Sequence, residues 1–309
     1  MISILQLINW ILAIIAINYK YNISRFNMTL LDGKSLSAKI KEEVKEEVEV
    51  LQNKGITPGL AVVLIGDDAA SATYVGMKSK ACKAAGIYSI VHEMPESISQ
   101  DKMLDIISMM NKNPNIDGIL VQLPLPPQID TTVILEAIDP HKDVDGFHPY
   151  NVGRVTAGLD GFIPATPYGV MKLLEEYNID PKGKNVCVVG ASNIVGKPMA
   201  TLMLNAHATV EICHIHTDDL KKHTLNADII CVGVGVINLI TEDMVKDDVI
   251  IIDIGVSRTD SGKLVGDVDF ENVSSKCSYI TPSPGGVGPM TIAMLLKNTV
   301  KAASMRESE

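Results

Sequence analysis

Residues 185–204 read NVCVVGASNIVGKPMATLML, the clearest structural signal in the chain. Its first part, residues 185–190, is a short apolar run that predicts a buried strand, and the residues after Gly196 have the spacing of a helix. Gly190 lets the intervening turn tighten, and Gly196 lets the helix approach the sheet closely. Backbone N–H groups at such a helix start can hold a diphosphate without a cation. The stretch therefore predicts a strand–turn–helix unit with a phosphate-binding turn.

Two interpretations of this turn stay open on the bare pattern. The G-x-G-x-x-G fingerprint is absent, so an ordinary βα turn fits the residues as well. The βαβ context that follows favours a dinucleotide site, in which Ser192 and Asn193 can add side-chain hydrogen bonds. An acid at the end of the second strand is typical of NAD sites, but Glu211 lies in the middle of TVEICH (209–214) and is expected to be exposed. The sequence therefore favours NADP over NAD.

Strands and helices alternate on both sides of this unit. Apolar runs at 60–68, 88–94 and 118–126 are separated by segments with helical spacing. The second half repeats the alternation, with strands expected at 209–214, 229–234 and 249–255 and a final amphipathic helix from residue 290. This order predicts an α/β protein with parallel sheets. The length of 309 residues suggests two domains, and the Gly- and Pro-rich segment 141–168 is the expected junction or active-site loop. The PSPGGVGP segment, residues 282–289, is expected to be a loop.

Composition excludes some classes of partner. The chain has 27 Lys and Arg against 37 Asp and Glu, a net charge of −10, and only 4% aromatic residues. This balance argues against a nucleic acid or an anionic membrane as the main partner. The five cysteines form no C-x-x-C pair, and the histidines follow no metal-ligand spacing, so no metal and no disulfide framework is expected. The cysteine usage predicts a reducing, cytoplasmic location.

Residues 1–27 differ from the rest of the chain. They are largely apolar at 2–17, carry Lys20 and Arg25, and contain no acidic residue. The apolar run is shorter than the roughly 20 residues of a membrane span. The segment also lacks the basic start and the cleavage site that are typical of a signal peptide. We interpret residues 1–27 as an N-terminal extension outside the fold, with Met28 as the working start and a weak membrane anchor as the alternative.

Four polar residues in apolar surroundings are candidates for chemistry. Tyr74 and Lys78 have i, i+4 spacing on a predicted helix and can meet on one face. A solvated lysine is the ordinary case, but a desolvated lysine has a lowered pKa and can transfer protons. Gln122 lies near the end of a strand, where open α/β sheets bind ligands, although a structural amide fits equally well. Asp145 lies in KDVDG, either as half of a turn pair with Asp143 or as a carboxylate for paired N–H donors of a ligand.

Met28 to the C-terminus resembles the bifunctional methylenetetrahydrofolate dehydrogenase/cyclohydrolase family. The resemblance rests on the order and spacing of several motifs, which are LDGK, YVGMKSKAC, DGILVQLPLP, KDVDGFHPYNVGR, GASNIVGKPM, VGDVDF and YITPSPGGVGPMT. It implies two α/β domains that flank a cleft, the second a Rossmann-like NADP-binding domain. The implied bounds are 28–150 for the folate-binding catalytic domain, joined by the C-terminal helix 290–309, and 151–289 for the NADP-binding domain. It also implies a homodimer.

The resemblance assigns roles to the matched residues around the substrate. Lys78 matches the central catalytic lysine, and Tyr74 matches a residue that stacks on or bonds the folate ring. Gln122 matches the glutamine that positions the lysine, and Asp145 matches the aspartate that binds the pterin edge. Gly285 and Gly286 belong to the loop implied to close over the site, which runs to Pro289.

For the cofactor, the resemblance assigns Gly190, Ala191 and Ser192 to the phosphate turn, and Ile215 and Val256 to positions along NADP. Some relatives carry a basic residue or serine at the place of Ile215, which contacts the 2′-phosphate, so NAD stays the alternative cofactor. Valine is common at the place of Ser283 and cysteine at that of Ala165, and both departures are mild.

The implied activity is oxidation of 5,10-methylenetetrahydrofolate with NADP and hydrolysis of the methenyl product to 10-formyltetrahydrofolate, in one-carbon metabolism and purine biosynthesis. Three alternatives remain: a dehydrogenase-only relative, another NAD(P)-dependent oxidoreductase with a small acid substrate, and a membrane-tethered binding protein without activity.

Overall fold

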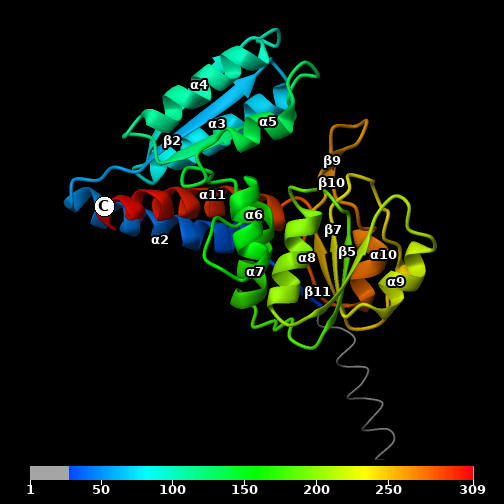
Figure 1. Ribbon diagram of the computed structural model, residues 1–309. Helices are drawn as coiled ribbons and strands as arrows, with labels where there is room; N and C mark the ends of the chain where they lie inside the picture. Colours follow the sequence, from blue (N-terminus) through cyan, green and yellow to red (C-terminus); the bar gives the residue numbers. More distant parts are fainter. Residues whose placement is uncertain (1–27, 309) are drawn as a thin grey trace, which may run out of the picture.

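The computed structural model describes residues 28–308, so the predicted N-terminal extension, residues 1–27, lies outside the described residues. The described chain forms two parallel sheets with helices against them (Figure 1). One sheet has three strands in the order β3-β2-β4, and the other has six in the order β1-β11-β8-β7-β5-β6. Every neighbouring pair in both sheets is parallel. The predicted α/β class with parallel sheets is therefore confirmed.

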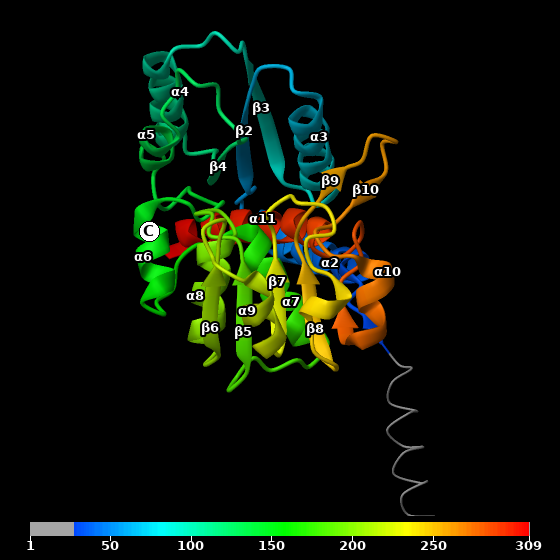
Figure 2. The ribbon, with the colours of Figure 1, turned by 90° about the vertical axis from the view of Figure 1, so that its right-hand side faces the viewer.

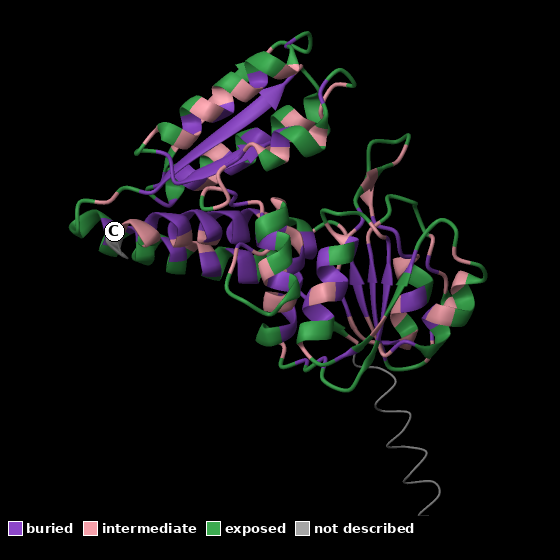
Figure 3. Cartoon of the chain, in the orientation of Figure 1, coloured by how far each residue is buried: buried purple, intermediate pink, exposed green. Residues whose placement is uncertain are grey.

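The first half of the chain builds the small sheet with its helices and contributes β1 to the large sheet. Its elements are β1 (Thr29–Leu30), α2 (Gly33–Asn53), β2 (Gly59–Ile65), α3 (Ala69–Ala84), β3 (Tyr88–Met94), α4 (Gln100–Lys112), β4 (Gly118–Val121) and α5 (Thr131–Glu136). The central strand β2 is buried along its whole length because helices cover both faces of the sheet, as is usual for parallel sheets (Figures 2 and 3). Helix α3 begins after Asp68, whose side chain accepts a hydrogen bond from the backbone N–H of Ser71.

The second half builds the large sheet. Its elements are α6 (Pro149–Thr156), α7 (Ala165–Glu176), β5 (Asn185–Val189), α8 (Gly196–Asn205), β6 (Thr209–Cys213), α9 (Leu220–Asn226), β7 (Ile229–Val232), β8 (Val249–Asp253), β9 (Ser257–Arg258), β10 (Leu264–Val265), α10 (Phe270–Val273), β11 (Cys277–Ile280) and α11 (Val287–Ser304). Strands β9 and β10 form a separate antiparallel hairpin. The edge strand of the large sheet, β6, keeps Ile212 exposed.

Helices α2, α7 and α11 join the two sheets. Helix α11 packs against both α2 and α7, and it runs between the two sheets (Figure 2). Its Asn298 is buried and donates to the carbonyl oxygens of Val144 at 2.8 Å and Ile163 at 2.9 Å. The last long helix of the chain thereby fixes the segment that connects the two sheets.

Three segments differ from the sequence-based expectations. The segment 282–289 is a loop only to Gly286, because α11 begins at Val287 with Pro289 in its first turn, where a missing N–H costs nothing. The junction 141–168 contains α6, which begins at Pro149 after His148, whose ring nitrogen accepts from the N–H of Tyr150. The two residues of β1 pair with β11 in the large sheet, an addition that the sequence pattern did not reveal.

No helix within residues 28–308 has both the length and the apolar composition to cross a bilayer.

The C-terminus is held by a partly buried ion pair, which allows a stability prediction. Arg306 contacts the buried Asp117 at 2.8 Å and donates to the carbonyl oxygens of Thr57 and Pro114. Replacing Arg306 with Met is expected to lower the free energy of unfolding by roughly 3 kcal/mol, because it leaves the Asp117 carboxylate buried without its cation. Urea denaturation measures the change. The matched control is Lys39→Met, which removes the exposed pair with Glu176 and is expected to cost about 0.5 kcal/mol or less. Equal losses in the two variants would contradict the anchoring role of Arg306.

Candidate functional site

Helix α3 brings Tyr74 and Lys78 together. The Lys78 ammonium lies 4.6 Å from the centroid of the Tyr74 ring, as the i, i+4 spacing predicts. Lys78 is only 5% exposed, whereas Lys80 on the same helix is exposed to solvent. Lys78 is therefore the unusual, desolvated lysine among those of this helix.

Gln122 follows β4 directly and contacts this lysine. Its side-chain Oε1 accepts a hydrogen bond from Lys78 Nζ at 3.0 Å, and its Nε2 donates to the carbonyl oxygen of Leu123 at 2.9 Å. Its backbone N–H donates to Val63 of the central strand, so the amide is fixed at both ends. The structure therefore brings Lys78, Tyr74 and Gln122 into one cluster at the carboxyl end of the small sheet.

The charges around this cluster shift its proton affinities. Burial lowers the pKa of Lys78, an effect that the nearby Asp145 carboxylate opposes. Burial also raises the pKa of Tyr74 to about 12 and that of Asp145 to about 6, the latter in spite of the opposing charge of Lys78. The charged forms of both the ammonium and the carboxyl group are thus destabilised by burial, as is typical of groups that transfer protons.

The two aspartates of KDVDG have different roles. Asp143 is buried and accepts from the N–H groups of Phe147 and His148 and from the amide of Asn151. It therefore fixes the turn that carries Asp145. Asp145 is the partly exposed member of the pair, and its charge interacts with Lys78. Asp143 is therefore the turn residue of this motif, and the role of Asp145 as a ligand-binding carboxylate stays a prediction.

The loop before α11 packs against the start of α2. Gly285 has a φ of +112°, which favours glycine, and its carbonyl oxygen accepts from the N–H of Lys34 at 2.9 Å. Gly286 packs so tightly on Gly33 that a Cβ atom at Gly33 would overlap its carbonyl oxygen. The loop is therefore held against the start of α2.

Two threonines are site residues that the sequence analysis missed. Thr291, in the first turns of α11, interacts with the Tyr74 side chain, and its hydroxyl lies 2.9 Å from that of Thr166 in α7. Thr291 lies in YITPSPGGVGPMT, a motif that carries the resemblance, whereas Thr166 lies outside those motifs. A hydroxyl on an amphipathic helix is ordinarily exposed, so the pattern alone had no signal for either.

The phosphate turn has the predicted close backbone packing. Gly190 has a φ of +123°, and a Cβ atom there would lie 2.9 Å from the carbonyl oxygen of Gly233. A Cβ atom at Gly196 would overlap the carbonyl oxygen of Gly190. Ser192 Oγ accepts from the N–H groups of Val195 at 3.2 Å and Gly196 at 3.3 Å, which caps the start of α8. Only glycine fits at the two glycine positions without displacement of the backbone.

The turn also offers hydrogen-bond donors. Within residues 28–308, the backbone N–H groups of Ala191, Ser192 and Asn193 donate to no protein acceptor. The Asn193 side chain instead accepts from Lys197 Nζ at 2.7 Å. Free N–H groups at the start of a helix, with a lysine close by, form a site for an anionic group such as a diphosphate.

Ile215 and Val256 lie at the same edge of the large sheet. Ile215 follows β6 and is 94% exposed, and Val256 follows β8 and is 53% exposed. Exposed apolar side chains at the carboxyl ends of parallel strands are suited to contact a planar ring of a ligand. The structure thus places the cofactor candidates at one edge of the large sheet, and the folate candidates in the small sheet and the start of α11. Their roles in binding stay predictions.

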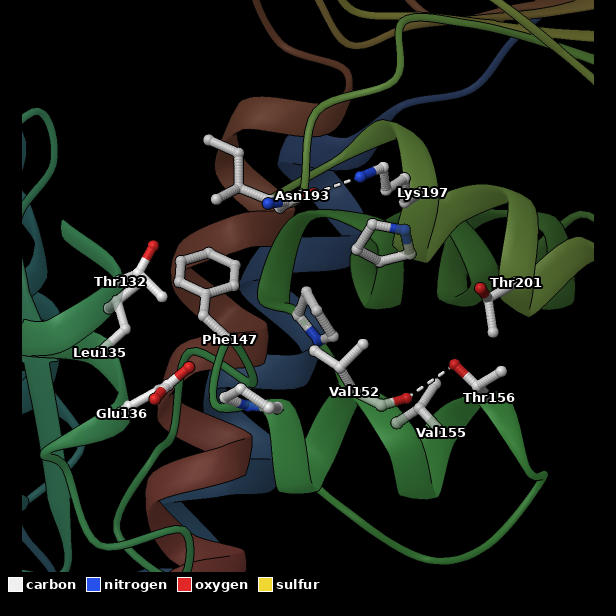
Figure 4. Close-up of a pocket in the computed structure, with 14 residues that line it drawn as sticks. Thr132, Leu135, Glu136, Phe147, Val152, Val155, Thr156, Asn193, Lys197 and Thr201 are labelled. Atoms are coloured by element: carbon white, nitrogen blue, oxygen red, sulfur yellow. Dashed lines mark hydrogen bonds between the residues drawn. The ribbon is translucent and has the colours of Figure 1, made fainter.

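One cavity among the described residues lies near the phosphate turn and does not contain the Lys78 cluster. It has a volume of about 470 Å³ and lies between α5, α6 and α8 (Figure 4). Its walls include Phe147, Val152 and Thr201, and the Asn193–Lys197 hydrogen bond lies at one end. Because this cavity lacks the titratable cluster, we place the chemistry at Lys78. Within residues 28–308, no group of three or more His, Cys, Asp or Glu side chains has a metal-binding arrangement.

Comparison with known proteins identifies the family of the chain. The catalytic-domain model of the tetrahydrofolate dehydrogenase/cyclohydrolase family matches residues 31–145, and the NAD(P)-binding-domain model of that family matches residues 164–307. The "Bifunctional protein FolD" of Sulfurimonas denitrificans is 70% identical over 283 residues, which cover 91% of this chain and 99% of the relative.

Solved structures agree with these matches. The crystal structure of the bifunctional FolD enzyme of Campylobacter jejuni has a TM-score of 0.89 and 59% identity and covers 90% of this chain and 99% of that one. The Trypanosoma brucei dehydrogenase–cyclohydrolase, solved with NADP and an inhibitor, has a TM-score of 0.88 and 35% identity over 91% of this chain and 99% of that one. The chain is therefore a bifunctional enzyme that belongs to the tetrahydrofolate dehydrogenase/cyclohydrolase family.

Proposed function

We propose that the protein oxidises 5,10-methylenetetrahydrofolate with NADP and hydrolyses the methenyl product to 10-formyltetrahydrofolate at the Lys78 cluster. The observation that carries the proposal is the hydrogen bond of 3.0 Å between the buried Lys78 and Gln122. A solvated lysine could not serve in this way, because its pKa would stay far above neutral pH. In this proposal Asp145 binds the paired N–H donors of the pterin, and Tyr74 stacks on the folate ring.

The oxidation requires orientation more than proton transfer. NADP, when bound, supplies the hydride acceptor. The residues present fit a dinucleotide, because Gly190 and Gly196 allow close backbone approach and the N–H groups of the turn are free. The chain's own contribution is to hold the folate ring between Tyr74 and Asp145, with the loop at Gly285 and Gly286 beside it. Such positioning converts an encounter of two molecules into a step within one complex.

The hydrolysis requires a proton acceptor. Water adds to the methenyl carbon, and the neutral amine of Lys78 takes the proton that the water loses. The bond from this carbon to N5 then breaks as the hydroxyl of the adduct loses its proton and N5 gains one, which forms the 10-formyl group, and the proton held by Lys78 passes to solvent. Burial lowers the pKa of Lys78 and so favours its neutral amine, and Gln122 holds the amine in place.

Replacing Gln122 with Glu is expected to shift the pH profile of the cyclohydrolase to higher pH. A carboxylate at this position would lie beside the ammonium and stabilise it, so the pKa of Lys78 would rise. The neutral amine would then form only at higher pH. The part of the profile in which the rate rises with pH should therefore move to higher pH by about one unit or more. The rate of methenyltetrahydrofolate hydrolysis against pH measures the shift. Gln128→Glu, on the exposed loop after β4, is the control. An unchanged or acid-shifted limb in the Gln122 variant would contradict the proposed role of Lys78.

We infer that NADP is preferred over NAD. Glu211, which could bind a ribose hydroxyl, is instead hydrogen-bonded to His223 at 3.0 Å and lies within β6. The end of β6 presents Ile215 and no acidic side chain in the turn His214–Thr217. The test is reduction of NADP and of NAD with methylenetetrahydrofolate, compared by kcat/KM. A higher kcat/KM with NAD would contradict the inference.

We further propose a cytoplasmic homodimer with the two domains bounded as the resemblance implies. The support for the location is the five cysteines, all free and buried. The support for a dimer is the exposed edge strand β6, because an unpaired edge with apolar side chains such as Ile212 favours association. Sedimentation equilibrium tests it, and a monomer at micromolar concentration would contradict it.

A further inference from the structure

Asp267 is fully buried in the large-sheet half of the chain, and its carboxylate binds a loop at the carboxyl edge of the sheet. Asp267 Oδ2 accepts from the N–H of Val234 at 2.6 Å and from that of Gly235 at 3.0 Å, while Oδ1 is buried with no hydrogen-bond partner among residues 28–308. Burying a carboxylate oxygen without a hydrogen-bond partner costs free energy of folding, so stability alone does not explain this side chain.

The loop that Asp267 binds is a wall of the phosphate turn. Val234 and Gly235 follow β7, and Gly190 of the phosphate turn lies so close to Gly233 and Val234 that any side chain at Gly190 would press on them. The side chain of Val234 is 40% exposed at the same edge. A displacement of this loop would therefore move one wall of the proposed dinucleotide site.

A second carboxylate fixes Asp267 itself. Asp253, at the end of β8, accepts from the N–H groups of Asp267 at 3.1 Å, Val268 at 3.1 Å and Gly255 at 3.0 Å. Asp253 thereby ties the turn that leads to Val256 to the segment that carries Asp267. Its pKa is raised to about 6, first by burial and also by the charge of Asp267. Within residues 28–308, neither carboxylate forms an ion pair with a lysine or arginine.

Two glycines make room for this pair. A Cβ atom at Gly255 would overlap the Asp267 carboxylate, and one at Gly266 would overlap that of Asp253. The backbone on both sides is thus shaped around the two side chains. Asp267 lies in the VGDVDF motif, residues 265–270, which contains no residue of the Lys78 cluster.

We infer that Asp267 is a positioning residue for the dinucleotide, which holds the Val234–Gly235 loop in the conformation that binds the cofactor, with Asp253 as its support. The inference rests on the proposed NADP site. It concerns only the oxidation, because hydrolysis of the methenyl substrate requires no dinucleotide.

The test is the variant Asp267→Asn, which keeps the shape of the side chain but removes its charge. Charge-assisted hydrogen bonds to the loop are weakened, and KM for NADP is expected to rise about tenfold or more. KM for the folate substrate and the rate of methenyl hydrolysis should stay within about twofold of wild type. The matched control is Asp269→Asn, two residues further on, whose carboxylate accepts a hydrogen bond from the side chain of Asn272 at 2.6 Å.

A second variant keeps the test valid if Asp267→Asn folds poorly. Gly255→Ala leaves every charge in place but displaces the Asp267 carboxylate, and the same rise in KM for NADP is expected. The inference is overturned if KM for NADP stays within twofold in the folded variants, or if hydrolysis falls in parallel with oxidation. Failure of the wild-type enzyme to reduce NADP with methylenetetrahydrofolate would instead contradict the proposed function, so the two failures are distinguishable.

Discussion

Replacing Lys78 with Met is expected to lower the rate of methenyltetrahydrofolate hydrolysis by roughly 10²–10⁴-fold, the usual contribution of a general acid–base group. Methionine keeps most of the length and the apolar stem of lysine, so the packing of α3 should change little, but it cannot accept or donate the proton. The Gln122 amide would keep its backbone contacts and lose only its ammonium partner. Hydrolysis of the isolated methenyl substrate, measured without dinucleotide, checks the result.

The matched control is Lys80→Met on the same helix. Lys80 is exposed, so its removal is expected to leave hydrolysis within about twofold of wild type and stability within about 0.5 kcal/mol. Unchanged hydrolysis in the Lys78 variant would remove the catalytic assignment, whatever the control shows. A large loss in both variants would point to disruption of α3 rather than to chemistry.

Replacing Gly196 with Ala is expected to impair the oxidation while the hydrolysis continues. The added Cβ atom would overlap the carbonyl oxygen of Gly190, so the phosphate turn and α8 must move apart. Overpacking of this kind costs roughly 1–3 kcal/mol, which corresponds to roughly a 5–150-fold rise in KM for NADP if it falls on the binding site. Initial rates of NADP reduction with methylenetetrahydrofolate give this KM.

Gly153→Ala is the control for this substitution. Gly153 lies in α6 with open space where its Cβ atom would be, so alanine there should leave both activities unchanged and favour the helix slightly. If Gly196→Ala binds NADP as wild type does, the turn at Gly190 is not the phosphate site. A parallel loss of hydrolysis would show that the substitution unfolds the enzyme instead.

Much of the fold could be predicted from the sequence because the strands are short apolar runs and the helices have clear spacing. The strands β2, β5 and β8 are buried on both faces, so nearly every residue in them is apolar and the pattern is strong. The elements that were missed lack such a pattern. Strand β1 has two residues, and α6 begins in a stretch rich in His, Pro and Gly.

The site was predicted where one helix or one strand end determines the geometry. The i, i+4 spacing brings Tyr74 to Lys78, and the end of β4 places Gln122. Contacts made across long chain separations could not be predicted. Thr291 reaches Tyr74 only because α11 returns between the sheets, and Arg306 reaches Asp117 from the last helical turn. A lone basic residue near a chain end is ordinarily solvated, so the pattern carried no signal for this ion pair.

The most direct test of the central claim is a coupled assay that follows two products at once. Methylenetetrahydrofolate and NADP are supplied, and methenyltetrahydrofolate and NADPH are measured together for wild type and for Lys78→Met. We predict that wild type forms NADPH with little methenyl accumulation, whereas the variant forms NADPH and one methenyl product for each. The same low accumulation in the variant, at an undiminished rate of NADPH formation, would contradict the claim that Lys78 carries the hydrolysis.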